Sequence, residues 1–371
     1  MDARGASLSW EQVEKFSELT DPLADAAVAH LKRFRPAELL ARVEAGGREG
    51  NPACEAFLDA TWTTPRWANP DAIEFGARVA RTFGLQQGVA LTVGSLAEGY
   101  ASPSLAAPLV ATGRLRLDTL KRVYETGQMF HNIRQPGALA PGAQGHRTIL
   151  QVRLLHAMVR RHLTRVGYKA PDGGAFVHQL DMAHTASQIS YRGIRAMQQL
   201  GIDFRPDELE AMHQMWRLAH HHHGVDVRLL PETFEAAAVF HARLAQHRFD
   251  PHNPYVRPLV SALLDATSKQ PPFYLPRMTL SALCRHVVGD VFCDAWNLER
   301  SEWGRRSAEV LMRTNRAASR AYRRFGVVIG APARLTSDTI HIRTLRGALG
   351  APHERAFGPI ADSRWGRRAG V

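Results

Sequence analysis

The chain has few cysteines, few lysines and no long apolar run. Its three cysteines, Cys54, Cys284 and Cys293, form no CxxC pair. A disulfide framework, an iron–sulfur centre or a zinc–thiolate centre is therefore not expected, and we interpret them as small buried hydrophobic residues. No apolar stretch reaches the roughly 18 residues that a membrane span needs. The N-terminus MDARGASLSW lacks an apolar signal core, so we expect a cytoplasmic protein.

The charge is strongly positive and comes almost entirely from arginine. The chain has 47 Lys and Arg against 35 Asp and Glu, a net charge of +12. Such a chain can bind nucleic acid, an anionic membrane surface or an acidic cofactor. It contains no helix-turn-helix, zinc-finger or RNP-type signature, so nucleic acid is not expected as a partner. Hydrophobic residues make up 45% of the chain, enough for a sizeable core.

The apolar spacing is helical almost throughout. Apolar residues recur every three or four positions in 25–45, 72–84, 117–131, 147–166, 175–200, 207–220, 232–247, 255–267, 278–296 and 302–325. The best strand candidate is the short segment 325–329. We predict one all-α domain over residues 16–330, with an N-terminal extension at 1–15 and a C-terminal extension or tail at 331–371.

The helix predicted over 146–165 carries the most informative pattern. His156 shares an apolar face with Val152 and Val159, and Arg153 and Arg160 flank it at offsets of −3 and +4. Burying an unpaired arginine is costly, so something anionic should meet these guanidinium groups. A haem would fit, with the imidazole on iron and the arginines on its propionates. From spacing alone the commoner arrangement is a core histidine whose arginines reach acidic side chains or the surface.

A second helix places polar residues in register. Arg122, Thr126 and Phe130 are spaced by four and share a face, and Lys121 and Glu125 form a neighbouring pair. Arg122 and Thr126 could hydrogen-bond a propionate or an oxygen ligand of iron. The alternative is an ordinary amphipathic helix.

A third helix has Asp181, Thr185 and Gln188 on one face. A carboxylate or hydroxyl there could hold the outer nitrogen of an iron-binding histidine. The alternative is a solvated helix face.

Two histidine-rich segments have plainer interpretations. A helix spreads the run His220–His223 too widely for all four residues to face one metal ion, although His220 and His223 could do so. We favour adventitious nickel or zinc binding, with a metal site as the alternative. His241, His247 and His252 lie near a predicted loop and should be exposed.

The last long helix has an arginine stripe. Its members are Arg306, Arg313, Arg316, Arg320 and Arg323. We interpret the stripe as a solvated face, with contact to an anionic membrane or a partner as the alternative. The opposite face, with Val310, Leu311, Ala317 and Ala318, should pack on the core.

Several of these segments together resemble one known family. The segment TGQMF at 126–130, PGAL at 136–139 and QVRLLHAMVRR at 151–161 closely resemble the signature region of the latex-clearing rubber oxygenases and the MpaB-like oxygenases. Weaker matches follow in the expected order: DPLAD at 21–25, GSL at 94–96, GY at 99–100, WR at 216–217, GV at 224–225 and LLP at 229–231. The resemblance covers roughly residues 20–310.

The resemblance implies a globin-like helical core with additional helices, which holds haem b and its iron. His156 would be the proximal iron ligand, with Arg153 and Arg160 supporting the haem. Arg122 and Thr126 match the family's conserved arginine and threonine, and Thr185 matches a further polar position. The family oxidatively cleaves isoprenoid double bonds, in rubber or in a farnesyl side chain.

Two departures bear on the substrate. Glu125 stands where the latex-clearing branch has a lysine that can approach the iron, and an ionised carboxylate could act only as a base. The secretion signal usual for rubber degradation is missing. We therefore predict a haem-b oxygenase that uses dioxygen on a smaller apolar, isoprenoid or other alkene substrate, with Arg122, Glu125 and Thr126 at the reaction site. A non-catalytic haem protein (gas sensor or haem carrier) and a helical scaffold without haem are the alternatives.

Overall fold

A computed structural model describes residues 8–29, 31, 36–111 and 119–349. The principal helices are α1 (Trp10–Glu14), α2 (Pro22–Ala29), α3 (Leu39–Arg48), α4 (Pro52–Thr61), α5 (Pro70–Thr82), α6 (Gly84–Ala90), α7 (Ala97–Gly99), α8 (Pro103–Ala111), α10 (Thr119–Ile133), α11 (Gln144–Arg165), α12 (Gln179–Ser187), α13 (Gly193–Gln199), α14 (Pro206–His222), α15 (Phe234–Arg248), α16 (Val256–Thr267), α17 (Arg277–Val288), α18 (Asp290–Ala295) and α19 (Glu302–Leu349). Two π-helical segments, Leu91–Leu96 and Gln188–Arg192, join α6 to α7 and α12 to α13.

The all-α prediction is confirmed, because the described ranges contain no strand. The best strand candidate, 325–329, is not a strand: this segment lies inside α19, where Phe325 has φ −126° and ψ 21° and kinks the helix. Helix α19 also continues past residue 330 to Leu349, and Ser337 and Asp338 are buried. The predicted domain boundary at 330 therefore falls within one helix.

Capping side chains set several helix starts. Asn51 accepts hydrogen bonds from the backbone amides of Ala53 and Cys54, and Asn69 does the same for α5. A proline follows each of these asparagines at the first helical position, where its missing N–H costs nothing. The start expected at 72 agrees with the observed start of α5 within a few residues, but no helix was expected where α4, α6, α7 and α8 lie.

The central core forms where α5 and α14 cross. Gly76 makes this crossing close, because a Cβ there would lie 2.2 Å from the carbonyl oxygen of Ala211. Trp216 and Phe130 fill the interior beside this contact, with ring centroids 4.8 Å apart. Two smaller cores flank the central one. One joins α2, α3 and α4 to α11, and the other joins α1, α12 and α15.

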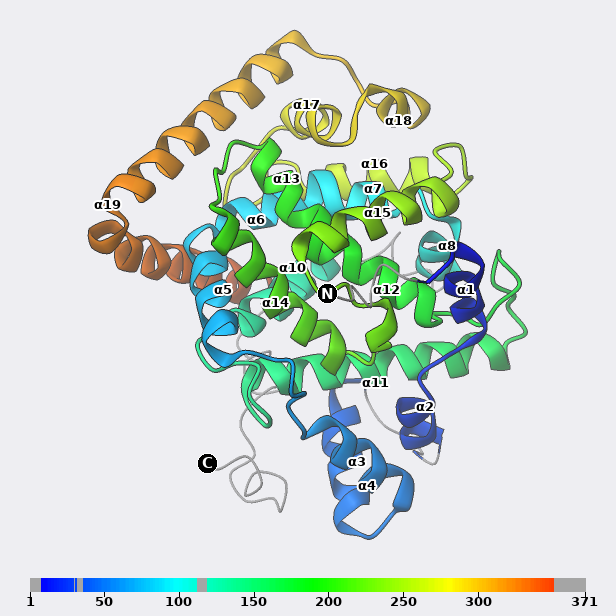
Figure 1. Ribbon diagram of the computed structural model, residues 1–371. Helices are drawn as coiled ribbons and strands as arrows, with labels where there is room; N and C mark the ends of the chain where they lie inside the picture. The colour runs from blue at the N-terminus through cyan, green and yellow to red at the C-terminus, as the bar shows by residue number, and fades with distance from the viewer. Residues whose placement is uncertain (1–7, 30, 32–35, 112–118, 350–371) are drawn as a thin grey trace.

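The position of α11 matters most for function. Figure 1 shows α11 running across the molecule between the central helices and the blue group α2, α3 and α4. Its buried residues include Leu150 and Leu154 on the side of α2–α4. Helix α19 lies along the outer edge and turns sharply partway along its length (Figure 1). None of the described helices combines the length and apolar character that crossing a bilayer requires.

Candidate functional site

His156 lies in the middle of α11 with an unsatisfied ring nitrogen. Its Nδ1 atom is buried and has no hydrogen-bond partner, although the residue as a whole is only half-buried. Burial, together with the positive charge of the nearby Arg160, lowers the pKa of His156 to about 4. The imidazole is therefore neutral at neutral pH, which is the form that binds a metal. A buried ring nitrogen without a partner in the protein is available to bind an external group such as a metal ion.

The run His220–His223 continues this imidazole-rich interior. The rings of His156 and His223 have centroids 5.5 Å apart and planes within 10° of each other, and His223 and His220 repeat the arrangement at 6.3 Å. The Nε2 atoms of His220, His222 and His223 are buried without partners. The expected adventitious nickel or zinc binding would need accessible imidazoles, whereas these three residues are at most 8% exposed.

Helix α2 supplies the anions that Arg153 and Arg160 require. The Nε and Nη2 groups of Arg153 donate to the Asp21 carboxylate at 2.6 and 2.9 Å. Arg160 donates to Asp25 at 2.9 and 2.8 Å and to the carbonyl oxygen of Val177 at 2.8 Å. Where the sequence argument placed haem propionates, the structure has carboxylates of the chain itself. The DPLAD segment thus provides both partners, one helical turn apart.

Gly224 is required by the Arg153–Asp21 pair. Its φ of +87° is unfavourable for other residues, and a Cβ there would lie 2.5 Å from both Arg153 Nε and Asp21 Oδ2. Arg153 also donates to the carbonyl oxygen of His222 at 3.3 Å, just before this turn. Three sequence segments therefore meet around His156: DPLAD, the α11 motif and the end of the histidine run.

Helix α10 holds the second predicted group. Arg122 and Thr126 are half-buried, and Glu125 is exposed. The far end of α10 is fixed to α11 by a 3.0 Å hydrogen bond from Asn132 to Thr148. Arg122 and Thr126 thus lie on a different helix from His156, ten and six residues before Asn132 at that junction.

An open cleft adjoins the beginning of α10. Its volume is about 710 Å³. Lys121 and Tyr124 line it from α10, Tyr274 from a loop, and Arg343 and Thr344 from the last turns of α19. Lys121 and Tyr124 are the sequence neighbours of Arg122 and Glu125, but Arg122, Glu125 and Thr126 do not themselves line the cleft.

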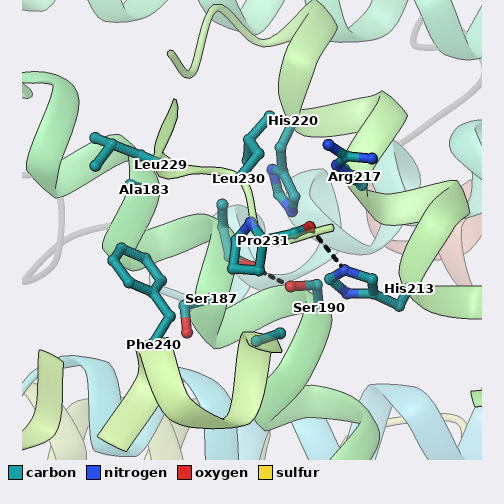
Figure 2. Close-up of a pocket in the computed structure, with 12 residues that line it drawn as sticks. Ala183, Ser187, Ser190, His213, Arg217, His220, Leu229, Leu230, Pro231 and Phe240 are labelled. Atoms are coloured by element: carbon teal, nitrogen blue, oxygen red, sulfur yellow. Dashed lines mark hydrogen bonds between the residues drawn. The ribbon is translucent and has the colours of Figure 1, made fainter. Parts of the chain in front are cut away.

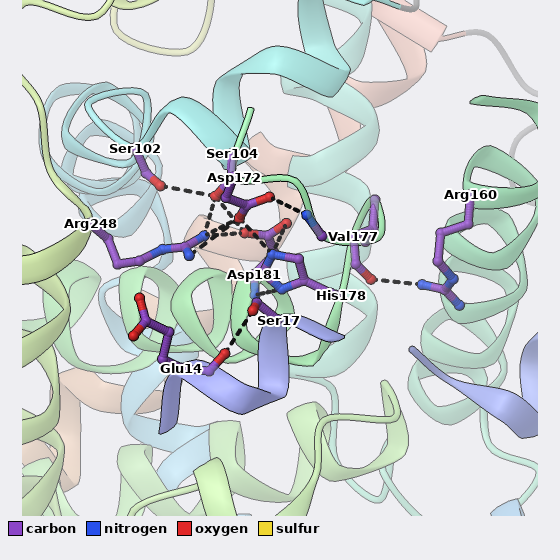
Figure 3. A network of polar contacts seen from close by, with 11 residues as sticks. Glu14, Ser17, Ser102, Ser104, Arg160, Asp172, Val177, His178, Asp181 and Arg248 are labelled. Atoms are coloured by element: carbon purple, nitrogen blue, oxygen red, sulfur yellow. Dashed lines mark hydrogen bonds and ion pairs between the residues drawn. The ribbon is translucent and has the colours of Figure 1, made fainter. Parts of the chain in front are cut away.

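Thr185 and Asp181, which were expected on one helix face, differ in burial. Thr185 is exposed on α12. Asp181 is buried, accepts hydrogen bonds from Ser104 at 2.6 Å and Arg248 at 2.8 Å, and lies near His178 (Figure 3). Its carboxylate is thus committed to this network and not to the outer nitrogen of His156, contrary to expectation.

The same network contains the residue types of a metal site, but an arginine already supplies the positive charge that a metal ion would bring. Ligand atoms of Asp172, His178 and Asp181 lie within 4.8 Å of one another. His178 Nδ1 accepts from the Asp181 amide, so its Nε2 carries the proton and donates to Asp172 at 3.0 Å. Arg248 contacts both carboxylates. A cation is therefore already present as the guanidinium group.

Residues from three α-helices and a π-helical segment form a buried polar group that sequence reasoning missed. His241 bonds to Glu98 and Ser187 at 3.1 Å each, so the expectation that it is exposed is wrong. Both ring nitrogens of His184 and both amide atoms of Gln188 are buried without partners. No local sequence pattern predicts this group, because its members come from α7, α12, α15 and the π-helical segment that begins at Gln188.

A small enclosed cavity lies between α12, α14 and α15 (Figure 2). Its volume is about 10 Å³, roughly the space of one water molecule. His213 and His220 line it, and His213 Nε2 bonds to the carbonyl oxygen of Pro231 at 3.0 Å. This cavity is too small for an organic substrate.

Known proteins resemble this chain in sequence and in fold. Residues 81–321 match the family described as ER-bound oxygenase mpaB/B′/rubber oxygenase, catalytic domain. A rubber oxygenase of Streptomyces sp. strain K30 is 25% identical over 255 residues, which is 66% of this chain and 60% of that relative's length. A solved structure of a latex-clearing protein in the closed state superposes with a TM-score of 0.59 at 21% identity, over 87% of this chain and 94% of the other.

The two kinds of likeness establish different things. At 21% identity the solved structure establishes the shared helical fold. The family match covers well over half of the chain and includes α10, α11, α12 and α14, which carry the residues described above. The chain therefore belongs to the family of MpaB-type and rubber oxygenase catalytic domains.

Proposed function

We propose that this protein is a haem-b-dependent oxygenase that uses dioxygen to cleave a double bond in an apolar, isoprenoid or other alkene substrate. The family assignment supports an oxygenase. The observation that supports haem ligation is the His156 imidazole, which is interior, neutral and unpartnered at Nδ1.

The residues around His156 fit a haem. Its neighbours on the same face, Val152 and Val159, are half-buried aliphatic residues suited to a porphyrin surface. Because Asp21 and Asp25 neutralise the adjacent arginines, we assign Arg153 and Arg160 to the positioning of α11 against α2. This lock would hold the imidazole in one orientation, as supporting contacts around a metal ligand do.

The reaction side would be formed by α10. When bound, the haem supplies the activation of dioxygen. Arg122 and Thr126 are hydrogen-bond donors that would orient the oxygen or a haem acid group, and Glu125 would accept a proton from its exposed position. Thr185 of α12 would contribute a further hydroxyl to the haem surroundings.

The substrate would enter through the cleft beside α10. The relative from Streptomyces is named a rubber oxygenase, but this chain has Glu125 where that branch has a lysine. A smaller apolar molecule met inside the cell fits the 710 Å³ cleft better than a polymer does. A cytoplasmic location is part of this proposal.

Haem binding is tested by the absorption spectrum of the purified protein. We expect a Soret band that is lost in His156→Ala and retained in His162→Ala, a matched control because His162 is exposed on the same helix. A protein that stays colourless after haem addition, or an unchanged band in His156→Ala, would contradict the proposal.

Catalysis is tested separately from binding. Oxygen consumption and aldehyde or ketone products are measured with a panel of isoprenoid alkenes, in the parent protein and in Arg122→Ala and Thr126→Val. We expect turnover in the parent and a loss of rate with haem retained in the variants. Haem binding without turnover of any alkene would favour a gas sensor or haem carrier instead.

A further inference from the structure

Helix α19 presents an unusual surface where it bends. Here the elbow surface means the exposed residues of α19 between Val310 and Leu335, on both sides of the kink at Phe325. Figure 1 shows this bend at the outer edge of the molecule. The family match ends at residue 321, so much of the elbow surface lies outside the part that the family shares.

The elbow surface has one sign of charge. Between Val310 and Ser337 the sequence has six arginines and neither aspartate nor glutamate. Four of them, Arg313, Arg316, Arg320 and Arg324, are exposed and follow one another at offsets of three, four and four, which places them on one helix face. None of the four has a carboxylate partner among the residues that the structure describes.

Apolar side chains border this arginine stripe. Val310 is 62% exposed, Phe325 51%, Val328 73% and Leu335 70%. Ala317, seven residues after Val310, is also exposed. The prediction that Val310, Ala317 and Ala318 pack on the core is wrong, because all three are exposed.

We propose that the elbow surface docks this protein on an anionic phospholipid membrane, with the arginines on the phosphate groups and the apolar side chains among the acyl chains. A basic stripe beside exposed aromatic and aliphatic residues is the composition of a helix that lies in a membrane interface. A nucleic acid would neutralise the arginines but would leave Val328 and Leu335 exposed, since its backbone offers phosphate and sugar. The lipid surface satisfies both kinds of side chain.

The position of the substrate cleft agrees with this partner. The last turns of α19, at Arg343 and Thr344, line the cleft beside α10. From Leu335 to Arg343 the helix advances eight residues, or about 12 Å. The helix that contacts the bilayer thus leads to the opening through which an apolar substrate dissolved in that bilayer would pass.

The purpose of this docking rests on the proposed oxygenase function, but its measurement does not. Vesicle co-sedimentation of the full chain uses phosphatidylcholine alone and phosphatidylcholine with about one third phosphatidylglycerol. We expect binding to the anionic vesicles at about 0.1 M salt, and a strong reduction at about 1 M, where charges are screened over roughly 3 Å. Failure of oxygenase activity with vesicle binding intact would overturn only the proposed function.

Two variants separate the charge from the apolar contact. Each arginine near an anionic surface strengthens binding about fivefold, so Arg316→Gln with Arg320→Gln should weaken it by about 25-fold. Val328→Ser with Leu335→Ser keeps the charge and should also weaken binding, because the inserted side chains are lost. Circular dichroism checks that both variants are folded.

A third variant is the matched control. Arg305→Gln with Arg306→Gln removes the same charge from the same helix, but these arginines already pair with Glu302. It should bind vesicles like the parent. Equal loss in this control, or full binding by Val328→Ser with Leu335→Ser, would show a nonspecific charge effect and overturn the proposal. So would DNA binding at the elbow surface without vesicle binding.

Discussion

Helices α11 and α19 are both rich in arginine and use it in opposite ways. On α11 three arginines are inside the molecule and each meets a carboxylate from another helix. The pairs are Arg147 with Glu44 at 2.6 Å, Arg153 with Asp21 at 2.6 Å and Arg160 with Asp25 at 2.8 Å. On α19 the exposed Arg313, Arg316, Arg320 and Arg324 have no such partner among the described residues, whereas Arg323 beside them pairs with Asp203 at 2.9 Å.

The difference shows that burial decides whether an arginine forms an ion pair within the protein or stays available for an external anion. A guanidinium group removed from water needs a carboxylate with good geometry, so the α11 arginines fix α11 against α2 and α3. An exposed guanidinium group costs nothing to leave unpaired and remains free for an external anion. The first kind should matter for folding and the second for association, which the following variants examine.

The largest expected effect comes from Arg153→Met. The change leaves the Asp21 carboxylate, which is 2% exposed, buried without its partner. Removing one member of a buried pair costs about 3–5 kcal/mol of unfolding free energy. Urea unfolding measures it. Arg42→Gln is the control, because the Arg42–Glu38 pair is exposed and should change stability by about 0.5 kcal/mol or less.

A double variant tests whether the loss in Arg153→Met comes from the unpaired Asp21 carboxylate. Replacing both partners, as in Arg153→Met with Asp21→Leu, should recover much of the lost stability, because no buried charge remains. If the double variant is as unstable as Arg153→Met alone, the pair is not the cause of the loss.

The variant Gly224→Ala should disturb the Arg153–Asp21 ion pair by crowding it from the backbone of residue 224. The added Cβ would lie 2.5 Å from Arg153 Nε and Asp21 Oδ2, at a residue whose φ is +87°. We expect a loss of about 3 kcal/mol, from overpacking together with the left-handed conformation. Gly50→Ala is a matched control with φ +83° and no atom within 4 Å; it should cost about 1 kcal/mol. Equal losses in the two variants would exclude crowding at Gly224.

Acid should destabilise the α11 side of the molecule. His146 of α11 is fully buried, and burial, outweighing a hydrogen bond to Thr61, lowers its pKa from 6.5 to about 4. In the unfolded chain this histidine is protonated below about pH 6.5, whereas in the folded chain it is protonated only below about pH 4. The free energy of unfolding therefore decreases as the pH is lowered from about 6.5 to about 4. Between about pH 7 and pH 5 this one group contributes a loss of about 2 kcal/mol.

The variant His146→Gln checks this assignment. It should lose about 2 kcal/mol less than the parent over that pH interval, whatever its stability at neutral pH. Urea unfolding at both pH values gives the difference. An identical pH dependence in parent and variant would mean that other buried histidines, such as His156, produce the acid sensitivity.

Local patterns predicted the long helices, α11 among them, but not the partners of the α11 side chains. The spacing around His156 required an anion for Arg153, and an anion is present; its identity as Asp21 depends on a contact across 132 residues. The burial of His220–His223 was missed for the same reason, since those residues are enclosed by helices distant in sequence. The exposed apolar residues of α19 were also missed, because the helical period alone does not show which neighbours are present to cover a face.

The smallest expected effect on folding comes from Arg320→Gln on α19. Arg320 is exposed and has no carboxylate partner among the described residues, so its removal should change the unfolding free energy by less than about 0.5 kcal/mol. The sign could even favour the variant, because the stripe places Arg316 and Arg324 within one turn of it and like charges at that spacing repel. A loss comparable to that of Arg153→Met would mean that the α19 stripe has an intramolecular partner, and the contrast between the two helices would fail.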